Sequence, residues 1–278
     1  MHPAKPLKSA RSLLHAPLRA AYALWALLAF LTVGVSALLL LVVLPSVDRR
    51  RAAARAAART FLRLAGMPLS VAFPERLPPG QCVVVCNHAS YLDGIVLTAA
   101  LPPRFGFVIK REMARVPFAG ALLKRLGSEF VERFDRHRVA RDARRVLRNA
   151  SRGQSLVFFP EGTFTRTPGL LKFHTGAFAT ATRAGCPLVP AVLRGTRRAL
   201  PPSGGLPRPG LLEMELLPPL TPAAPADEHA APGLRERARA AILTALGEPD
   251  LTCCDDTARP PDTAPARSAR ASRPSRTP

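Results

Sequence analysis

Aromatic residues, acidic residues and cysteines are all scarce in this 278-residue chain. It contains one Trp and two Tyr, and no stretch interleaves aromatic with basic side chains as RNA-binding surfaces do. Zinc-finger and helix-turn-helix signatures are absent, so we expect no nucleic-acid partner, although the formal net charge is +21. Motifs for binding a metal or a nucleotide are also absent. We therefore expect no metal site and no bound cofactor.

The cysteine content excludes a disulfide framework. There are five cysteines, an odd number, which indicates a reducing compartment. Cys82 and Cys86 lack the second pair of ligands that a structural zinc site needs. Because both lie in an apolar, strand-like run, we expect them to behave as small hydrophobic residues.

Charged residues are missing altogether between Ala20 and Val47. As a helix, the apolar run 20–44 is long enough to cross a hydrocarbon core of about 30 Å. Tyr22 and Trp25 lie near one end, where interfacial aromatic residues belong. A cleaved signal peptide has a shorter apolar region, of about 7 to 15 residues, and a buried core helix usually has a polar face. We therefore expect an uncleaved membrane anchor within residues 1–66.

Basic residues flank the apolar run on both sides. The heavier cluster follows the run, and the positive-inside tendency then places the following domain in the cytoplasm, at the cytoplasmic (inner) membrane. A segment that enters one leaflet and returns would explain the two-sided charge as well, and the sequence does not separate these alternatives. The flanking residues are Lys5, Lys8, Arg11 and Arg19 before the run and Arg49, Arg50, Arg51 and Arg55 after it.

Arginines also recur every four residues just after the apolar run. In a stretch rich in helix formers they would form one stripe along a helix that stops near Gly66. Such a stripe suits an anionic membrane surface, to which each basic side chain contributes about 1 kcal/mol. The alternative is a merely solvated basic face. The arginines are Arg51, Arg55, Arg59 and Arg63.

Beyond residue 66, short apolar runs alternate with helix-like stretches. This alternation predicts an α/β fold in residues 67–250, a single domain with a mostly buried, parallel or mixed sheet flanked by helices. Residues 251–278 have the composition of a disordered tail. The expected strands are 69–73, 82–86, 105–109, 129–131, 155–159, 188–193 and 211–217. The expected helices are 91–101, 118–126, 137–150, 176–184 and 234–246.

Residues capable of acid–base chemistry directly follow two of these strands. His88 and Asp93 come just after the run 82–86, with four residues between them. A neutral imidazole can take a proton from an alcohol, and a carboxylate on its other nitrogen fixes the tautomer. Alternatively, His88 caps a helix and Asp93 is a solvated acid in its first turn. The second element, FFPEGT at 158–163, again follows an apolar strand and favours the catalytic interpretation.

Asn-His-x4-Asp at 87–93 followed by Phe-Pro-Glu-Gly-Thr at 159–163 resembles the glycerolipid acyltransferase family. Its familiar members are the 1-acylglycerol-3-phosphate acyltransferases, which are lysophospholipid acyltransferases of phospholipid biosynthesis. Three further blocks, at 127–133, 172–178 and 188–192, are similar to family blocks and occur in the family's order. The resemblance covers roughly residues 70–220.

This resemblance implies a membrane-bound O-acyltransferase. It would move a fatty acyl group from a thioester, acyl-CoA or acyl carrier protein, to the free hydroxyl of 1-acylglycerol 3-phosphate and give phosphatidic acid. His88 would be the base and Asp93 its orienting carboxylate, and no cofactor is required. Two alternatives stay open. The first is the same chemistry on another lysophospholipid, glycerol 3-phosphate or a lyso-aminolipid, and the second is a non-catalytic basic membrane protein that binds lipid.

The resemblance also implies which residues hold the acceptor. They are Arg133, Glu161, Gly162 and Thr163, together with Arg166 and Lys172. One position departs from the family, whose members commonly carry arginine directly after Glu-Gly-Thr, because this chain has Phe164 there. Arg166 or Lys172 would then supply the positive charge.

Two of these residues also have a structural alternative. Arg133 would form a surface ion pair with Glu129 or Glu132, and Glu161 would be an N-capping or structural carboxylate. Pro190, inside the last expected block, is expected at a strand edge or a bulge.

Overall fold

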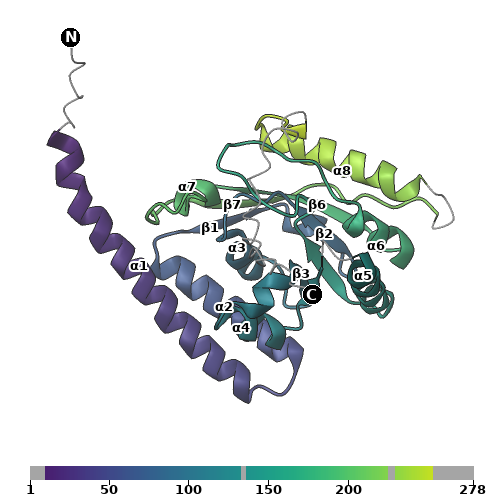
Figure 1. Cartoon of the computed structure of the whole chain (residues 1–278), viewed down its shortest axis with the longest axis horizontal. Helices are drawn as coiled ribbons and strands as arrows, with labels where there is room; N and C mark the ends of the chain where they lie inside the picture. Colours follow the sequence, from purple (N-terminus) through teal and green to yellow (C-terminus); the bar gives the residue numbers. More distant parts are fainter. Residues whose placement is uncertain (1–9, 133–135, 225–228, 253–278) are drawn as a thin grey trace, which may run out of the picture.

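The computed structural model describes residues 10–132, 136–224 and 229–252 (Figure 1). Within them lies a seven-stranded sheet of order β1-β7-β6-β2-β5-β3-β4. The five strands from β6 to β4 are mutually parallel, and β7 runs antiparallel to β6. The strands are β1 (Leu69–Ala72), β2 (Val83–Cys86), β3 (Phe105–Lys110), β4 (Glu129–Val131), β5 (Ser155–Phe158), β6 (Leu188–Arg194) and β7 (Leu212–Leu216).

Helices cover both faces of this sheet (Figure 1). One face packs against α2 (Val47–Leu64) and α3 (Asp93–Ala100), and the other against α6 (Gly176–Ala184) and α8 (Ala230–Leu246). Helix α5 (Arg136–Ser151) packs on β5 through Val146 and Ala150. Every residue of β2 is buried, as expected for a central parallel strand. The remaining elements are α1 (Ala10–Val43), α4 (Ala119–Arg125), α7 (Thr196–Ala199) and the short 3-10 turns η1 (Pro74–Arg76) and η2 (Arg111–Arg115).

The expected α/β class with a mixed, largely buried sheet is confirmed. All seven expected strands form, with ends within about two residues of the expected ones. The five expected helices of the domain form as well, and α7 is an additional short helix that the sequence pattern did not indicate. Four residues offer too little periodicity to identify a helix from sequence.

The expected strand edge at Pro190 is wrong, because Pro190 lies in the interior strand β6 opposite Val85 of β2, whereas the alternative of a bulge agrees with the register beside it. Ala191 pairs with Leu216 and Leu188 pairs with Leu220, so the segment opposite β6 carries one extra residue between these two pairs. The Pro190 carbonyl accepts from Leu217 N–H within this bulge. The missing proline N–H therefore falls where the regular antiparallel ladder is interrupted.

Helix α2 has a defined start and end. Ser46 is the N-cap and its hydroxyl accepts from Arg49 N–H, while Gly66, with φ +61°, follows the last turn. Met67 N–H bonds back to Leu62 O at 2.9 Å, which satisfies a terminal carbonyl as in a Schellman turn. The stop expected at Gly66 is therefore present.

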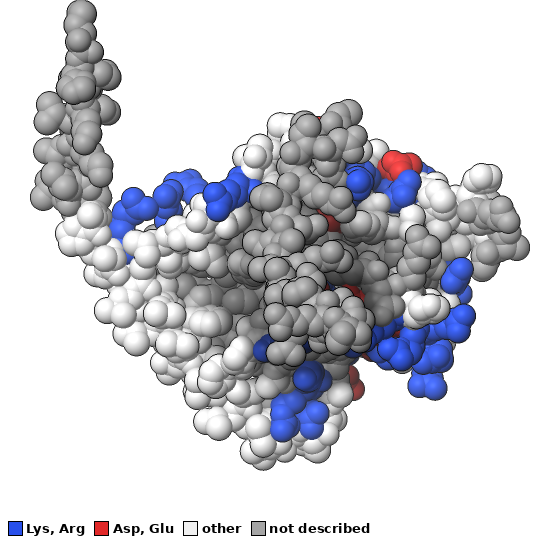
Figure 2. Space-filling view, in the orientation of Figure 1, with Lys and Arg blue, Asp and Glu red and all other residues white. Residues whose placement is uncertain are grey.

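Helix α1 lies along α2 over most of its length (Figure 1). Near the start of its apolar stretch, the Tyr22 hydroxyl donates to Ala65 O and Trp25 Nε1 donates to Leu64 O. Near its end, Arg125 Nη1 donates to Leu41 O. Residues 16–43 are long and apolar enough to cross a membrane by length and composition. The outward surface is strongly apolar, and Figure 2 shows it almost without charged side chains.

Candidate active site

The candidate site lies where two neighbouring parallel strands end. Strands β2 and β5 pair in register, with Val85 opposite Phe158. Because the carboxyl ends of parallel strands meet at the same edge of a sheet, the segments that follow β2 and β5 lie side by side. The two motifs, 73 residues apart at His88 and Glu161, are in this way brought into direct contact.

His88 and Asp93 form the pair that the sequence predicts. The His88 Nδ1 atom lies 2.8 Å from Asp93 Oδ2, and the Asp93 side chain is fully buried. The same carboxylate oxygen accepts from Ala89 N–H at 2.7 Å and Ser90 N–H at 2.9 Å, and Asp93 begins α3, where the helix dipole favours an anion. These contacts fix the carboxylate, which in turn fixes the imidazole. Since Nδ1 is engaged and the His88 side chain is 18% exposed, Nε2 is the nitrogen left for a substrate.

Glu161 is joined to the backbone beneath the histidine. Its Oε1 accepts from His88 N–H at 2.6 Å, and its Oε2 accepts from Leu171 N–H at 2.9 Å. The residue is 4% exposed, and burial raises the pKa of its carboxyl to about 7 against an ordinary value of 4.5. Both oxygens thus face protein donors, so this geometry is that of a group that positions His88.

Aromatic rings surround the imidazole. The ring of Phe159 stacks on His88 with centroids 4.1 Å apart, and Phe164 meets it edge to face at 4.5 Å. Phe164 also contacts Tyr91 at 4.9 Å, and Tyr91 is 69% exposed. Phe164, which stands where the family that the motifs resemble commonly has arginine, therefore forms an apolar wall beside the imidazole.

Hydrogen bonds to elements further along the chain hold the two loops that follow β2 and β5. Asn87 is buried and pairs twice with the backbone of Leu193 in β6, which fixes the segment before His88. Arg197, in α7, donates to the carbonyl oxygens of Thr165 and Thr167 and also meets Glu248 at 3.4 Å. The loop that carries Phe164 is therefore tied to the end of β6.

Most of the other residues expected to bind an acceptor are exposed or lie outside the described residues. Arg133 lies outside the described residues. Thr163, Arg166 and Lys172 are exposed, and Gly162, with φ +74°, donates its N–H to Phe159 O. The structure thus brings His88, Asp93, Glu161 and Gly162 together, and it leaves Arg166 and Lys172 at the surface of the loop beyond them.

The second block is held by an ionic cluster in which partly exposed arginines pair with largely buried carboxylates. Arg145 of α5 pairs with Glu129 at 2.9 Å and with Asp142 at 3.0 Å. Asp142 also accepts from Arg111 and from Glu132 N–H. Burial alone would raise the pKa of Asp142, but the bonds from Arg111 and Glu132 N–H hold it below its ordinary value. Glu129 is therefore already paired within the domain.

Two nucleophiles next to His88 in the chain, Cys86 and Ser90, are not suited to attack an acyl group. Cys86 is fully buried, and burial raises the pKa of its thiol well above the ordinary value, so a thiolate is disfavoured. The Ser90 hydroxyl is buried and donates to Leu200 O. Within the described ranges, no group of three His, Cys, Asp or Glu residues is arranged to hold a metal ion.

Sequence reasoning missed several residues that shape this site. Phe159 and Asn87 were quoted only as parts of motifs, and Arg197 was not singled out at all. For Asn87 the signal was its place between a buried strand and His88. Arg197 follows the end of β6, where site residues of such sheets gather.

Comparison with known proteins agrees with these motifs. Residues 68–194 match the family described as Acyltransferase. A 1-acyl-sn-glycerol-3-phosphate acyltransferase of Escherichia coli is 31% identical over 144 residues, which are 51% of this chain and 57% of that protein. One of Saccharomyces cerevisiae is 29% identical over 159 residues, 56% of this chain and 52% of that protein. A chloroplastic one of Brassica napus is 33% identical over 129 residues, 46% of this chain and 37% of that protein.

The chain thus spans only about half the length, or less, of these three relatives. Among solved structures, the crystal structure of the 1-acyl-sn-glycerophosphate acyltransferase from Thermotoga maritima is similar, with a TM-score of 0.68 and 19% sequence identity. The similarity covers 88% of this chain and 98% of that one, and it establishes the fold.

Proposed function

We propose that this chain transfers a fatty acyl group from a thioester to the hydroxyl of 1-acylglycerol 3-phosphate, giving phosphatidic acid, because residues 68–194 match the family described as Acyltransferase and similar proteins are named for that activity. The observation that carries this proposal is the imidazole of His88, which is oriented by a fully buried carboxylate 2.8 Å away. Such a pair is a general base for an alcohol. The named activity of the relatives supports the choice of acceptor.

The proposed reaction needs no covalent intermediate on the protein. His88 Nε2 takes the proton of the acceptor hydroxyl as its oxygen attacks the thioester carbonyl carbon. The carbon–sulfur bond then breaks, and the departing thiolate receives that proton from the imidazolium. Asp93 stabilises the imidazolium between these steps. The buried thiol of Cys86 and the engaged hydroxyl of Ser90 support this direct transfer.

In this proposal Glu161 acts through His88, since its carboxylate holds the His88 backbone N–H. Arg133, Gly162, Thr163, Arg166 and Lys172 remain candidates for the acceptor phosphate, in the roles that the family resemblance implies. The donor is acyl-CoA or acyl carrier protein, and both carry negative charge that suits a chain of formal net charge +21.

We place the protein at the cytoplasmic face of the inner membrane, held by α1 and by attraction to anionic lipid. Helix α1 is bonded near the start of its apolar stretch to Ala65, which follows α2, and near the end of that stretch to Arg125 of α4. Since both ends of the apolar stretch lie against the domain, we infer that this stretch is embedded in one leaflet with both of its ends on the cytoplasmic side. Its apolar outer surface supports this arrangement.

A second candidate keeps the chemistry and changes the acceptor. The observation that favours it is the ring of Phe164 against His88, which puts an apolar group where a family arginine would face a phosphate. Another lysophospholipid or a lyso-aminolipid would be compatible with such a wall.

The experiment compares wild type with His88→Ala in membranes supplied with a labelled acyl thioester and a panel of lyso acceptors. We expect transfer to fall by a factor of about 10³ or more, because removal of a general base costs at least that order. The histidine control is His229→Ala, since His229 lies at the start of α8, away from the site, and should retain full activity. The acceptor that yields product decides between the two candidates.

Two results would contradict this mechanism. One is near-native turnover by His88→Ala. The other is stable labelling of the wild-type protein by the thioester when no acceptor is present, which would indicate an acyl-enzyme.

A further inference from the structure

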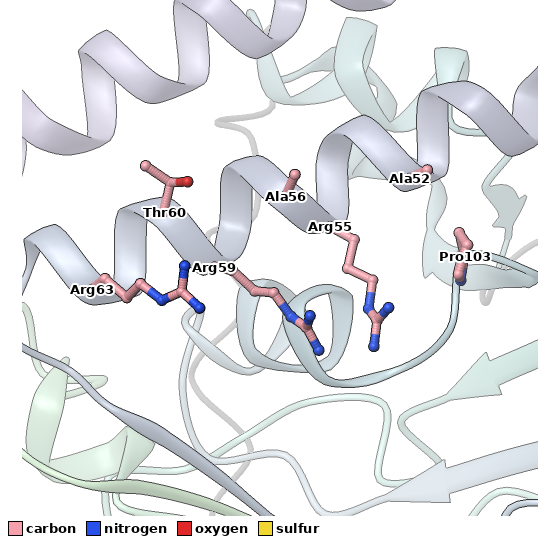
Figure 3. Close-up of a pocket in the computed structure, with 7 residues that line it drawn as sticks. All are labelled: Ala52, Arg55, Ala56, Arg59, Thr60, Arg63 and Pro103. Atoms are coloured by element: carbon pink, nitrogen blue, oxygen red, sulfur yellow. The ribbon is translucent and has the colours of Figure 1, made fainter.

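Helix α2 borders a groove that the proposed reaction does not use. The groove has a volume of about 290 Å³ and is lined by Arg55, Arg59 and Arg63, with Thr60 and with Pro103 from the connection between α3 and β3. Figure 3 shows the three arginine side chains extending from the same side of α2. They share one side because residues four apart lie on the same face of a helix.

This groove is rich in cations and lacks an anion. No acidic residue lines it, and among the described residues no carboxylate lies within ion-pair distance of Arg55, Arg59 or Arg63. Like charges four residues apart destabilise a helix. Burial, and then the neighbouring charge of Arg59, lower the pKa of Arg55. The Arg55 Nε atom is buried without a hydrogen-bond partner.

Hydrogen bonds within the protein engage only some of the N–H donors of the arginines on α2. Arg51, one turn earlier, is bonded through all three of its guanidinium nitrogens, which donate to the carbonyls of Leu126, Arg104 and Gly127. Arg55 and Arg59 each make one bond, to Ala100 O and Ala99 O at the end of α3. Arg63 donates no side-chain hydrogen bond to any described residue. Donors therefore remain free in the groove.

The groove is separate from the candidate active site. Arg55 and Arg59 contact the last carbonyls of α3, whereas Asp93, at the first residue of α3, contacts His88. An eight-residue helix is about 12 Å long, so the two sites lie at opposite ends of α3. A ligand in the groove would not contact His88.

The groove lies close to the surface that faces the bilayer in the proposed arrangement. Arg63 directly precedes Leu64 and Ala65, whose carbonyls accept from Trp25 and Tyr22 of α1. Tyrosine and tryptophan of membrane proteins occupy the headgroup level. Helix α2 lies between the apolar α1 and the sheet (Figure 1). The arginines are then at the depth of lipid phosphates.

We propose that this groove binds the phosphate monoester headgroup of a lipid, such as phosphatidic acid, as a second site distinct from the acceptor site. Planar guanidinium groups bind phosphate oxygens in pairs, and a monoester dianion matches several arginines better than the single charge of a phosphodiester. The Thr60 hydroxyl offers one more donor. The inference rests on the proposed membrane position of α1 and is independent of the proposed acyl transfer.

The test uses the full chain in phosphatidylcholine micelles and measures its melting temperature during titration. Three ligands are compared: phosphatidic acid, phosphatidylglycerol with the same acyl chains, and inorganic phosphate. We expect phosphatidic acid to raise the melting temperature by about 5 °C at about 100 times its dissociation constant. Phosphatidylglycerol should give a clearly smaller rise. A rise with inorganic phosphate as well would assign the site to the phosphate itself, and a rise with the lipid alone would assign it to the anchored headgroup.

Phosphatidic acid would also be the product of the proposed reaction, so the groove is isolated by variants. Arg59→Gln/Arg63→Gln should lose most of the rise. Arg63→Gln alone should weaken binding about tenfold, and it leaves the described hydrogen bonds in place should the double variant fail to fold. The matched control is Arg144→Gln/Arg148→Gln, which removes two exposed arginines at the same spacing from α5.

Three outcomes would overturn the proposal: an undiminished rise in Arg59→Gln/Arg63→Gln and Arg63→Gln, an equal rise with phosphatidylglycerol, or a rise with inorganic phosphate but not with the lipid. Failure of the acyl-transfer proposal is recognised separately, because His88→Ala should keep the part of the rise that depends on Arg63.

Discussion

Glu161 is the residue whose protonation is most strongly coupled to folding in this site. Its carboxyl pKa is about 7 in the folded protein because of burial, against 4.5 ordinarily. Between these pH values the folded protein holds a proton that the unfolded chain has released. The stability contributed by this group is therefore present below pH 4.5 and is lost as pH rises toward 7.

We predict that Glu161→Gln removes this pH dependence. Relative to the variant, the free energy of unfolding of wild type should fall by up to about 1.4 kcal/mol per pH unit between pH 5 and 7. Urea unfolding of both proteins across that range measures the difference. A constant difference would show that the Glu161 carboxyl titrates near its ordinary pKa.

Phe164 is the residue that most directly bears on acceptor choice. Its ring is 4.5 Å from the His88 ring and 4.9 Å from the Tyr91 ring, measured between centroids. We predict that Phe164→Arg raises kcat/KM for a phosphate monoester acceptor relative to a zwitterionic lysophospholipid by about tenfold, since one charge-assisted hydrogen bond has that effect. Phe164→Leu, which keeps an apolar wall, is the control. Equal changes for all acceptors would mean that residue 164 does not face the headgroup.

At the level of elements, the pair α1 and α2 decides how the protein meets the membrane. Phe30 of α1 packs edge to face on Phe61 of α2 at 5.5 Å, and hydrogen bonds at Tyr22 and Leu41 hold α1 near both ends of its apolar stretch. A helix that crossed the bilayer would have to leave these contacts. The arrangement therefore favours insertion into one leaflet.

We predict that a membrane-impermeant thiol reagent reaches both ends of the apolar stretch of α1 from the same side of the membrane. Single cysteines at Ala20 and Ser46 are compared in sealed vesicles, with Arg237→Cys on exposed α8 as the reference for the domain side. The background carries Cys253→Ser and Cys254→Ser. All three positions should be labelled in the same vesicle orientation. Labelling of Ala20→Cys and Ser46→Cys from opposite sides would instead indicate a spanning helix.

On the scale of the whole molecule, the site depends on strands that are distant in sequence. The parallel pairing of β2 with β5 brings His88 to Glu161, and β6 on the other side of β2 supplies the contacts of Asn87 with Leu193. The site is thus assembled from three neighbouring strands. Helix α7 then fixes the Phe164 loop through Arg197.

The sequence by itself determined the elements and the candidate catalytic pair. Alternation of apolar runs with helical stretches is a local property, so strands and helices were predictable, and His88 and Asp93 are close enough in the chain for one turn to join them. The apolar run of α1 was equally evident, because no charged residue occurs between Ala20 and Val47.

Only the tertiary structure decided which side chains surround the imidazole and how the arginines of α2 are used. Phe164, Glu161 and Arg197 reach the site through strand order and loop paths, which follow from packing between residues far apart in the chain. The sequence repeats arginine every four residues along α2 and gave no sign that these arginines differ. In the structure, Arg51 is bonded through all three guanidinium nitrogens, while the other three line a groove: Arg55, Arg59 and Arg63. That difference arises because hydrogen-bond acceptors from α3 and α4 lie beside some turns of α2 and not others.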